Sequence, residues 1–214
     1  MTHRLIVCAV MIVFALTYSA NGQEQQIKEL KNSNPDSSRV ITNAALGFSF
    51  AKIGQVTASD SSGYSLILGD SLSESAPKSV AHISTADELF IDLPGSFGGR
   101  LYYGSPDMKS LAASRLVSDS LSNGAVKFRR EYWAVYAGMG AWEEVVNCYT
   151  RQNGHYYVIS LTRDRALGKP GMQAEGKQLT AEELQAKAVA SLRDTTDAAI
   201  KQFNELLASF RIEK

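Results

Sequence analysis

The chain has 214 residues, in which 22 lysines and arginines balance 22 aspartates and glutamates. A near-neutral protein has no general electrostatic attraction for nucleic acid or for an anionic membrane surface, so the charge balance argues against both as partners. The length is ample for one folded domain and short for two.

Residues 1–22 have the order of a secretory signal peptide. A short basic start precedes an apolar run over residues 5–16, which is shorter than the roughly 20 residues that cross a bilayer as a helix. Small residues follow, and we predict cleavage after Gly22, with Ala20 as the alternative. The sequence therefore predicts a periplasmic or secreted protein with no membrane span after cleavage. An uncleaved membrane anchor is the other interpretation.

Cleavage would leave Cys148 as the one cysteine, because Cys8 lies inside the signal. An internal disulfide is then impossible, and stability must come from the core. Residues 23–38 are polar and end in Asn-Ser-Asn-Pro-Asp-Ser-Ser, which predicts a flexible leader. We expect residues 39–214 to form a single α+β domain.

The first half of this domain predicts strands and then a helix. Apolar residues between turn-forming residues are typical of strands. Segments of this kind are 40–41, 46–50, 64–68, 80–83 and 88–93. A helix is expected next, since Ser105 is a good N-cap residue and Pro106 suits the first helical position. Apolar residues continue at helical spacing to Leu116.

Asn153-Gly154 favours a two-residue type I′ hairpin, because both residues tolerate positive φ. With Gln152 opposite His155, the apolar residues of both strands share one face. The further predicted pairs are Thr150 with Tyr157, Cys148 with Ile159, Val146 with Leu161, and Glu144 with Arg163. The neighbouring strand is predicted over residues 126–134, joined through the glycine bend at 138–140.

The chain ends in a predicted helix. Thr180 and Glu183 match a capping box, and an apolar stripe continues at helical spacing to Phe210. The β-branched pair Thr195-Thr196 lowers helix propensity, so we expect a bend there. Because the strands are joined by hairpins and the helices are segregated rather than alternating with them, the predicted fold is a mainly antiparallel β-sheet covered by helices.

Two short segments resemble the ends of PsbP-like domains. Residues 43–50 read Asn-Ala-Ala-Leu-Gly-Phe-Ser-Phe, and residues 206–210 read Leu-Leu-Ala-Ser-Phe. The proline usual after the Gly-Phe strand is absent, and Ile53-Gly54 stands there instead. The resemblance implies an α/β/α sandwich in an exported protein that binds or assists other proteins rather than catalysing. It implies no shared set of catalytic residues.

No catalytic or metal-binding pattern stands out in the sequence. None of His82, Cys148 and His155 lies within a helical turn of another along the chain, so we predict no metal and no cofactor. A set of Ser160, His155 and Asp164 would need a β-bulge, because residues 155 and 160 point to opposite faces of a regular strand. We therefore expect a binding function rather than a catalytic one.

Two features are candidates for binding. Trp133, Tyr136 and Trp142 surround the glycine bend, and exposed aromatic residues there would form a recognition surface. Packing of these aromatics against helices is the alternative. Arg130 shares its strand phase with apolar neighbours, which suggests either an anion-binding site or a side chain that extends to a sheet edge.

The sequence as a whole predicts an exported, non-catalytic binding or accessory module of the cell envelope or secreted space. Its expected partner is another envelope protein or a small ligand. A hydrolase with an unrecognised active site is the alternative function. That alternative requires a Ser or Cys, a His and a carboxylate to meet within hydrogen-bond reach.

Overall fold

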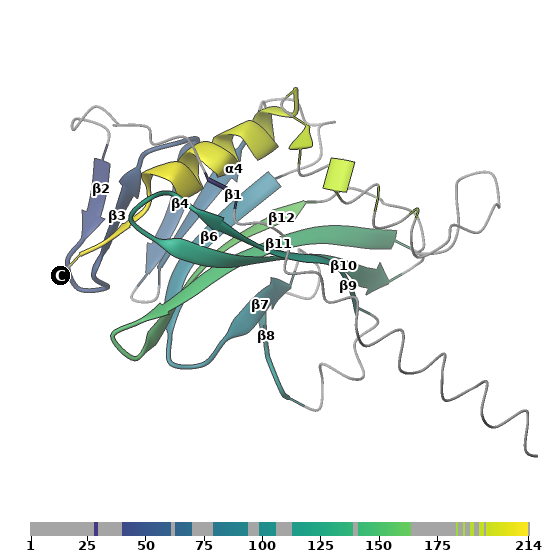
Figure 1. Ribbon diagram of the computed structural model, residues 1–214, viewed down its shortest axis with the longest axis horizontal. Helices are drawn as coiled ribbons and strands as arrows, with labels where there is room; N and C mark the ends of the chain where they lie inside the picture. Colours follow the sequence, from purple (N-terminus) through teal and green to yellow (C-terminus); the bar gives the residue numbers. More distant parts are fainter. Residues whose placement is uncertain are drawn as a thin grey trace, which may run out of the picture.

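The computed structural model describes residues 28–29, 40–60, 63–69, 79–93, 99–105, 113–138, 141–163, 183, 186, 189–190, 193–194 and 196–213. Its main element is an eight-stranded sheet (Figure 1). Neighbouring strands pair antiparallel, apart from the parallel pair β1 and β9 at one edge. In spatial order the strands are β1 (Lys28–Glu29), β9 (Ala113–Ser122), β10 (Lys127–Gly138), β11 (Ala141–Gln152), β12 (His155–Arg163), β6 (Ser79–Ala86), β5 (Gly63–Leu68) and β4 (Gln55–Asp60).

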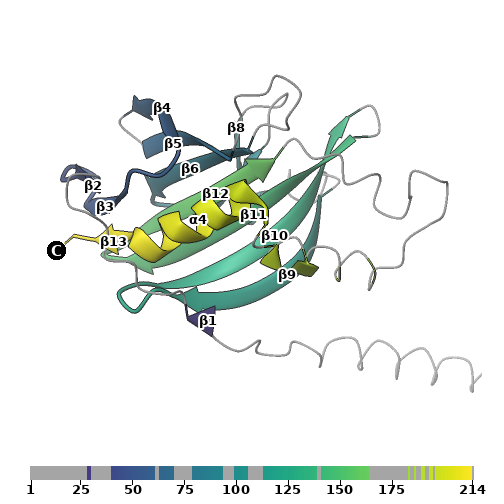
Figure 2. The same cartoon turned by 90° about the horizontal axis from the view of Figure 1, so that it is seen from above.

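A helix and two smaller sheets pack around this central sheet. The helix α4 (Ala198–Ser209) runs across one face, over the middle strands (Figure 2). A three-stranded sheet of β2 (Val40–Asn43), β3 (Phe48–Ala51) and β13 (Arg211–Ile212) lies beside it. The hairpin of β7 (Phe90–Leu93) and β8 (Gly99–Tyr102) lies on the opposite face (Figure 1). We call these two faces the helix face and the hairpin face.

The expectation of a mainly antiparallel sheet is confirmed, but the predicted covering of helices is wrong. In the part of the chain that the structure describes, α4 covers one face and a β-hairpin covers the other, so the fold is β-rich rather than an α/β/α sandwich. The hairpin face carries buried polar residues, among them Glu131, Asn147 and Ser160. Such groups need hydrogen-bond partners, and the apolar side of a helix supplies none.

The helix predicted from Ser105 to Leu116 is also wrong over its described part, because β9 begins at Ala113. Residues 106–112 lie outside the described residues. Along β9, Val117, Asp119 and Leu121 are buried and pair with residues of β10. Cross-strand pairing and burial override local helix preference here.

The core between α4 and the sheet is apolar and aromatic. Phe203, Leu206 and Leu207 of α4 are almost fully buried, and Phe210 packs on Phe128 with ring centroids 6.0 Å apart. The sequence forms this layer because α4 is amphipathic and the strands beneath it alternate. Burial of this apolar surface is the main contribution to the stability of the domain.

Side-chain hydrogen bonds hold both ends of α4. Asp197 is the N-cap residue and accepts from the backbone N–H of Ile200 at 3.1 Å. At the other end, Asn123 Nδ2 donates to the carbonyls of Leu207 and Phe210, both at 2.8 Å. The start of α4 after Asp197 agrees with the interruption expected at residues 195–196. The predicted capping residue Thr180 lies outside the described residues.

The predicted hairpin around Asn153-Gly154 is confirmed in its turn and its register. Asn153 and Gly154 have φ of 55° and 88°, as a type I′ turn requires. The five predicted pairs all occur, from Gln152 opposite His155 to Glu144 opposite Arg163. Arg163 Nη1 lies 3.4 Å from Glu144 Oε2, and Arg163 also pairs with Asp197, so this charged contact links β11 and β12 to α4.

The other strand predictions are confirmed within a few residues, as β2, β3, β5, β6, β7 and β10. The predicted signal peptide lies outside the described residues. Within the predicted leader, Lys28–Glu29 form the short strand β1. No helix in the described part of the chain is long and apolar enough to cross a membrane.

Candidate functional site

A row of polar side chains crosses the hairpin face of the central sheet. Directly paired residues of adjacent strands point to the same face, so the cross-strand register defines this row. Its members, from β5 to β9, are Ser65, His82, Ser160, Asn147, Glu131 and Ser118. The polar row thus spans six strands on the face opposite α4.

Part of the polar row holds the β7–β8 hairpin in place. Asn147 Nδ2 donates to the carbonyl of Phe90 at 3.0 Å, and Ser160 Oγ donates to Asp92 Oδ2 at 2.5 Å. Arg100 of β8 donates to Ser84 Oγ at 2.8 Å. These polar contacts dock the hairpin on the middle of the sheet and leave the β9–β10–β11 end to other side chains.

Glu131 is the acidic member of the polar row and is 1 % exposed. Its Oε1 accepts from Arg115 at 3.0 Å and, more weakly, from the Tyr149 hydroxyl at 3.5 Å. Its Oε2 accepts from Trp133 Nε1 at 3.1 Å and from the Tyr103 hydroxyl. Four donors therefore surround one carboxylate, and this satisfies a buried charge that would otherwise be costly.

Glu131 also affects the pKa values of Tyr149 and Tyr103, the two tyrosines that contact it. Burial, and then the nearby Glu131 charge, raise the pKa of Tyr149 to about 12. Burial and the hydrogen bond to Glu131 raise the pKa of Tyr103 further. Both phenols therefore stay protonated at neutral pH and act as hydrogen-bond donors. Neither is suited to be a nucleophile or a base, since both roles need the deprotonated form.

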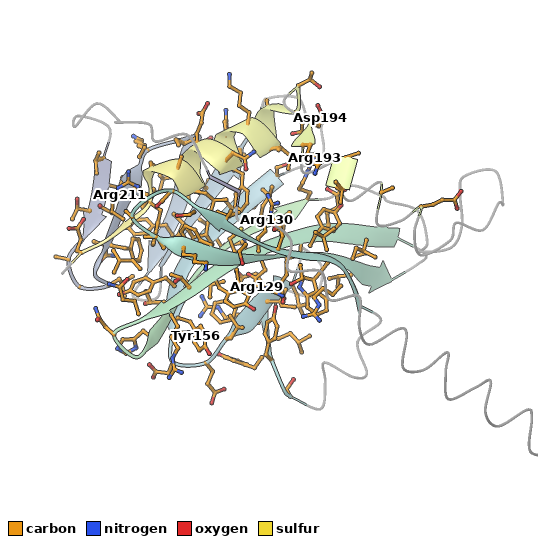
Figure 3. All side chains as sticks on the ribbon, viewed as in Figure 1. Arg129, Arg130, Tyr156, Arg193, Asp194 and Arg211 are labelled. Atoms are coloured by element: carbon orange, nitrogen blue, oxygen red, sulfur yellow. The ribbon has the colours of Figure 1, made fainter. Side chains whose placement is uncertain are left out.

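Five side chains between Glu131 and the β11–β12 turn form a surface that we call the tyrosine–arginine face. They are Lys127 and Arg129 of β10, Tyr149 and Arg151 of β11, and Tyr156 of β12. Arg129 lies opposite Tyr149, and Arg151 lies opposite Tyr156, so all five point to the hairpin face. The three cations are exposed and the two tyrosines are half-buried. Figure 3 shows Arg129 and Tyr156 on the side of β7 and β8, and Arg130 on the side of α4.

The tyrosine–arginine face has an excess of positive charge. Among the described residues, no carboxylate lies within ion-pair distance of Lys127, Arg129 or Arg151. The Arg151 guanidinium lies over the Tyr156 ring, 5.4 Å from its centroid. Glu131, the nearest acid along β10, is buried and already bound by four donors. This surface can therefore accept an anionic group from outside the chain.

Two of the binding residues predicted from sequence are buried. Trp133 is 8 % exposed and donates to Glu131. Arg130 is 7 % exposed, and its Nε and Nη2 donate to the Asp119 carboxylate at 2.8 and 2.5 Å. Tyr136 and Trp142 lie opposite each other in the β10–β11 ladder, and their side chains are outside the described part. Arg130 and Trp133 point to opposite faces of β10, so these two residues do not share a site.

Two of the residues considered for catalysis, Ser160 and His155, are separated, and the third, Asp164, lies outside the described residues. Ser160 is buried and donates to Asp92, whereas His155 lies beside the hairpin turn and contacts Asp87 at 2.7 Å. Burial raises the pKa of Cys148 to about 12, so its thiol stays in the unreactive protonated form. Within the described residues, no three His, Cys, Asp or Glu side chains are placed to hold a metal ion.

Comparison with known proteins adds no assignment: no protein-family model matches the chain, and no curated protein matches it. The functional reading therefore depends on the site alone. Sequence reasoning missed the tyrosine–arginine face, although the predicted register of the β11–β12 hairpin indicates which side chains share that face. If Cys148 and Ile159 face the core, their neighbours Tyr149 and Val158 must face the other way.

Proposed function

We propose that the protein is an exported, non-catalytic binding or accessory module that recognises another envelope or secreted protein through the tyrosine–arginine face. The observation that carries this proposal is a surface of two half-buried tyrosines and three exposed cations, in which the cations have no carboxylate partner among the described residues. The PsbP-like resemblance of the sequence, with its implied role in binding or assisting other proteins, is part of the same proposal.

Tyrosine and arginine are suited to this role. Both are enriched among the residues that contribute most to protein–protein affinity. A tyrosine presents a large contact area with few rotatable bonds, so little side-chain entropy is lost on binding. On this face the Arg151–Tyr156 contact and the Tyr149–Glu131 hydrogen bond already restrict both rings. A partner would thus meet a surface whose side chains are ordered before binding.

A capture experiment with matched variants tests this function. The purified protein, a Tyr149→Ser/Tyr156→Ser variant and a Lys201→Glu variant would be immobilised and exposed to envelope and secreted extracts. Lys201 is exposed on α4, on the other face of the sheet, so its variant is a folded surface control. We expect a partner that wild type and Lys201→Glu retain and the double tyrosine variant loses. Capture of the same proteins by all three would contradict the proposal.

The binding role first predicted for the glycine bend stays a prediction. It concerns Tyr136 and Trp142, at the far end of the β10–β11 pair from the tyrosine–arginine face. A Trp142→Ala variant in the same capture experiment tests it. Loss of the partner on this change, with the double tyrosine variant unaffected, would move the proposed surface to the bend.

A hydrolase is the second candidate function, because one serine–histidine contact exists on the hairpin face. Ser65 Oγ and His82 Nδ1 are 2.9 Å apart, and both residues are half-buried. A histidine in this position could accept the serine proton during nucleophilic attack. In the described part of the chain no carboxylate is paired with His82, so the third group that this alternative requires is not in place. Covalent labelling by a fluorophosphonate probe, lost in Ser65→Ala, would support a hydrolase. Absence of labelling in wild type would leave binding as the function.

A further inference from the structure

We infer that the segment recognised by the tyrosine–arginine face is an extended acidic peptide of a partner protein. This inference rests on the proposed function, and it adds the chemistry and conformation of the partner. It depends on three features of the face: its charge, the spacing of its side chains, and the neutral phenol that lies among the cations.

The positive charge of the face indicates a negatively charged partner. Lys127, Arg129 and Arg151 are exposed cations on a chain whose total charge is balanced, so the positive charge is local to this face. Arg115, at its border, is 50 % exposed and is already bonded to Glu131. Arginine presents a planar fork of donors that matches a carboxylate. Carboxylates from another chain would therefore supply the partners that these cations lack among the described residues.

Strand geometry gives the conformation of the partner. Lys127 and Arg129 are two residues apart on β10, which places their Cα atoms about 6.8 Å apart along the strand. Alternate residues of an extended peptide have the same spacing and point to one side. Acidic side chains at alternate positions of such a peptide would meet Lys127 and Arg129 in register. Neighbouring strands lie about 4.8 Å apart, so Arg151 of β11 can reach the same acidic segment.

Tyr149 adds an uncharged aromatic ring to this cationic surface. Its hydroxyl hydrogen bond to Glu131 is long, at 3.5 Å, and burial and Glu131 raise its pKa to about 12. The phenol therefore stays uncharged and does not repel an incoming carboxylate. Tyr156, under the Arg151 guanidinium, supplies an apolar ring against which the peptide backbone can pack.

Fluorescence anisotropy with a labelled peptide of alternating Glu and Ser tests the inference. We expect wild type to bind this peptide with an affinity that falls as salt rises, because the contacts are ionic. Arg129→Glu/Arg151→Glu should weaken binding at least about tenfold, the effect of losing one charge-assisted contact. Lys201→Glu makes a charge change of the same sign on α4 and should alter binding less than about twofold. Unchanged thermal unfolding of the double arginine variant would show that the loss does not come from misfolding.

Control ligands identify the outcomes that overturn the inference. Equal affinity for an alternating Lys and Ser peptide, or an equal loss with Lys201→Glu, would show non-specific binding. Binding of a uronic-acid polysaccharide through Arg129 and Arg151, without binding of the Glu-Ser peptide, would replace the peptide by a glycan. If the double tyrosine variant loses its captured partner but no acidic peptide binds wild type, the acidic peptide is wrong and the binding function stands. If capture is unchanged in that variant as well, both proposals fail.

Discussion

The two faces of the central sheet are built from different chemistry. On the helix face, Phe128, Tyr132 and Ile159 are buried beneath an amphipathic helix. On the hairpin face, the polar row is held by specific hydrogen bonds, such as Asn147 to Phe90 and Ser160 to Asp92. The helix face is stabilised mainly by non-directional apolar burial, and it also contains the buried Arg130–Asp119 ion pair. The hairpin face combines directional contacts with a smaller apolar cluster around Trp133.

This difference explains where a binding surface can arise. An apolar face is stable only when it is covered, so α4 lies across the middle of it. A polar face needs cover only over its buried groups, and the β7–β8 hairpin provides that. We propose that a partner binds at the end of the hairpin face that carries Arg129, Tyr149 and Tyr156. We therefore expect changes on the helix face to affect folding and changes on the tyrosine–arginine face to affect binding.

The largest effect should come from Phe203→Ala on the helix face. Phe203 is 2 % exposed on α4, and removal of a buried phenylalanine side chain lowers the free energy of unfolding by about 3–5 kcal/mol. Urea denaturation followed by circular dichroism measures the loss. Lys201→Ala, on the exposed side of the same helix, is the control and should change stability by less than about 0.5 kcal/mol. Similar losses in both variants would mean that α4 is not held by its buried face.

A smaller effect is expected from Glu131→Gln on the hairpin face. The substitution keeps the shape and removes the charge that four donors bind, so the free energy of unfolding should fall by about 1–3 kcal/mol. The indole N–H of Trp133 donates to this carboxylate, so tryptophan fluorescence should also change. Ser120→Ala, at a half-buried position on the same face, is the matched control. Wild-type stability in Glu131→Gln would contradict a central role for the cluster.

Alkaline pH should lower the free energy of unfolding through Cys148, which is buried on the helix face. The pKa of this thiol rises from 9.0 to about 12 in the folded protein because of burial. The protonated thiol is favoured by the fold, so its contribution is complete below pH 9 and is lost as pH rises from 9 towards 12. The loss is up to about 1.4 kcal/mol per pH unit for one group. Urea titrations at several pH values should show a shallower decline for Cys148→Ala, and identical slopes would contradict this assignment.

The smallest effect on stability should come from the tyrosine–arginine face. Arg129 and Arg151 are exposed, so Arg129→Gln/Arg151→Gln should change the free energy of unfolding by less than about 0.5 kcal/mol. Thermal unfolding measures this, with the Phe203→Ala protein as the contrasting case. A large loss of stability in the arginine variant would mean that these side chains are structural.

Much of the β11–β12 hairpin could be predicted from the sequence. A type I′ turn has only one register that puts Cys148, Val146, Ile159 and Leu161 on one face, and the structure has it. The same alternation places Tyr149, Arg151 and Tyr156 together on the other face. The fold prediction failed where contacts between distant parts of the sequence determine the structure. Local patterns contain no information about such contacts, of which the hydrogen bond from Tyr103 to Glu131 is an example. For the same reason, apolar spacing near Leu116 suggested a helix, whereas pairing with β10 makes a strand.

Amide chemical-shift mapping tests the division between the two faces most directly. The isotopically labelled protein would be titrated with the alternating Glu-Ser peptide, and shifts would be compared between β10–β12 and α4. We predict changes at residues 127–129, 149–151 and 156, with α4 unaffected. Changes concentrated on α4, or none at saturating peptide, would contradict the tyrosine–arginine face as the binding surface.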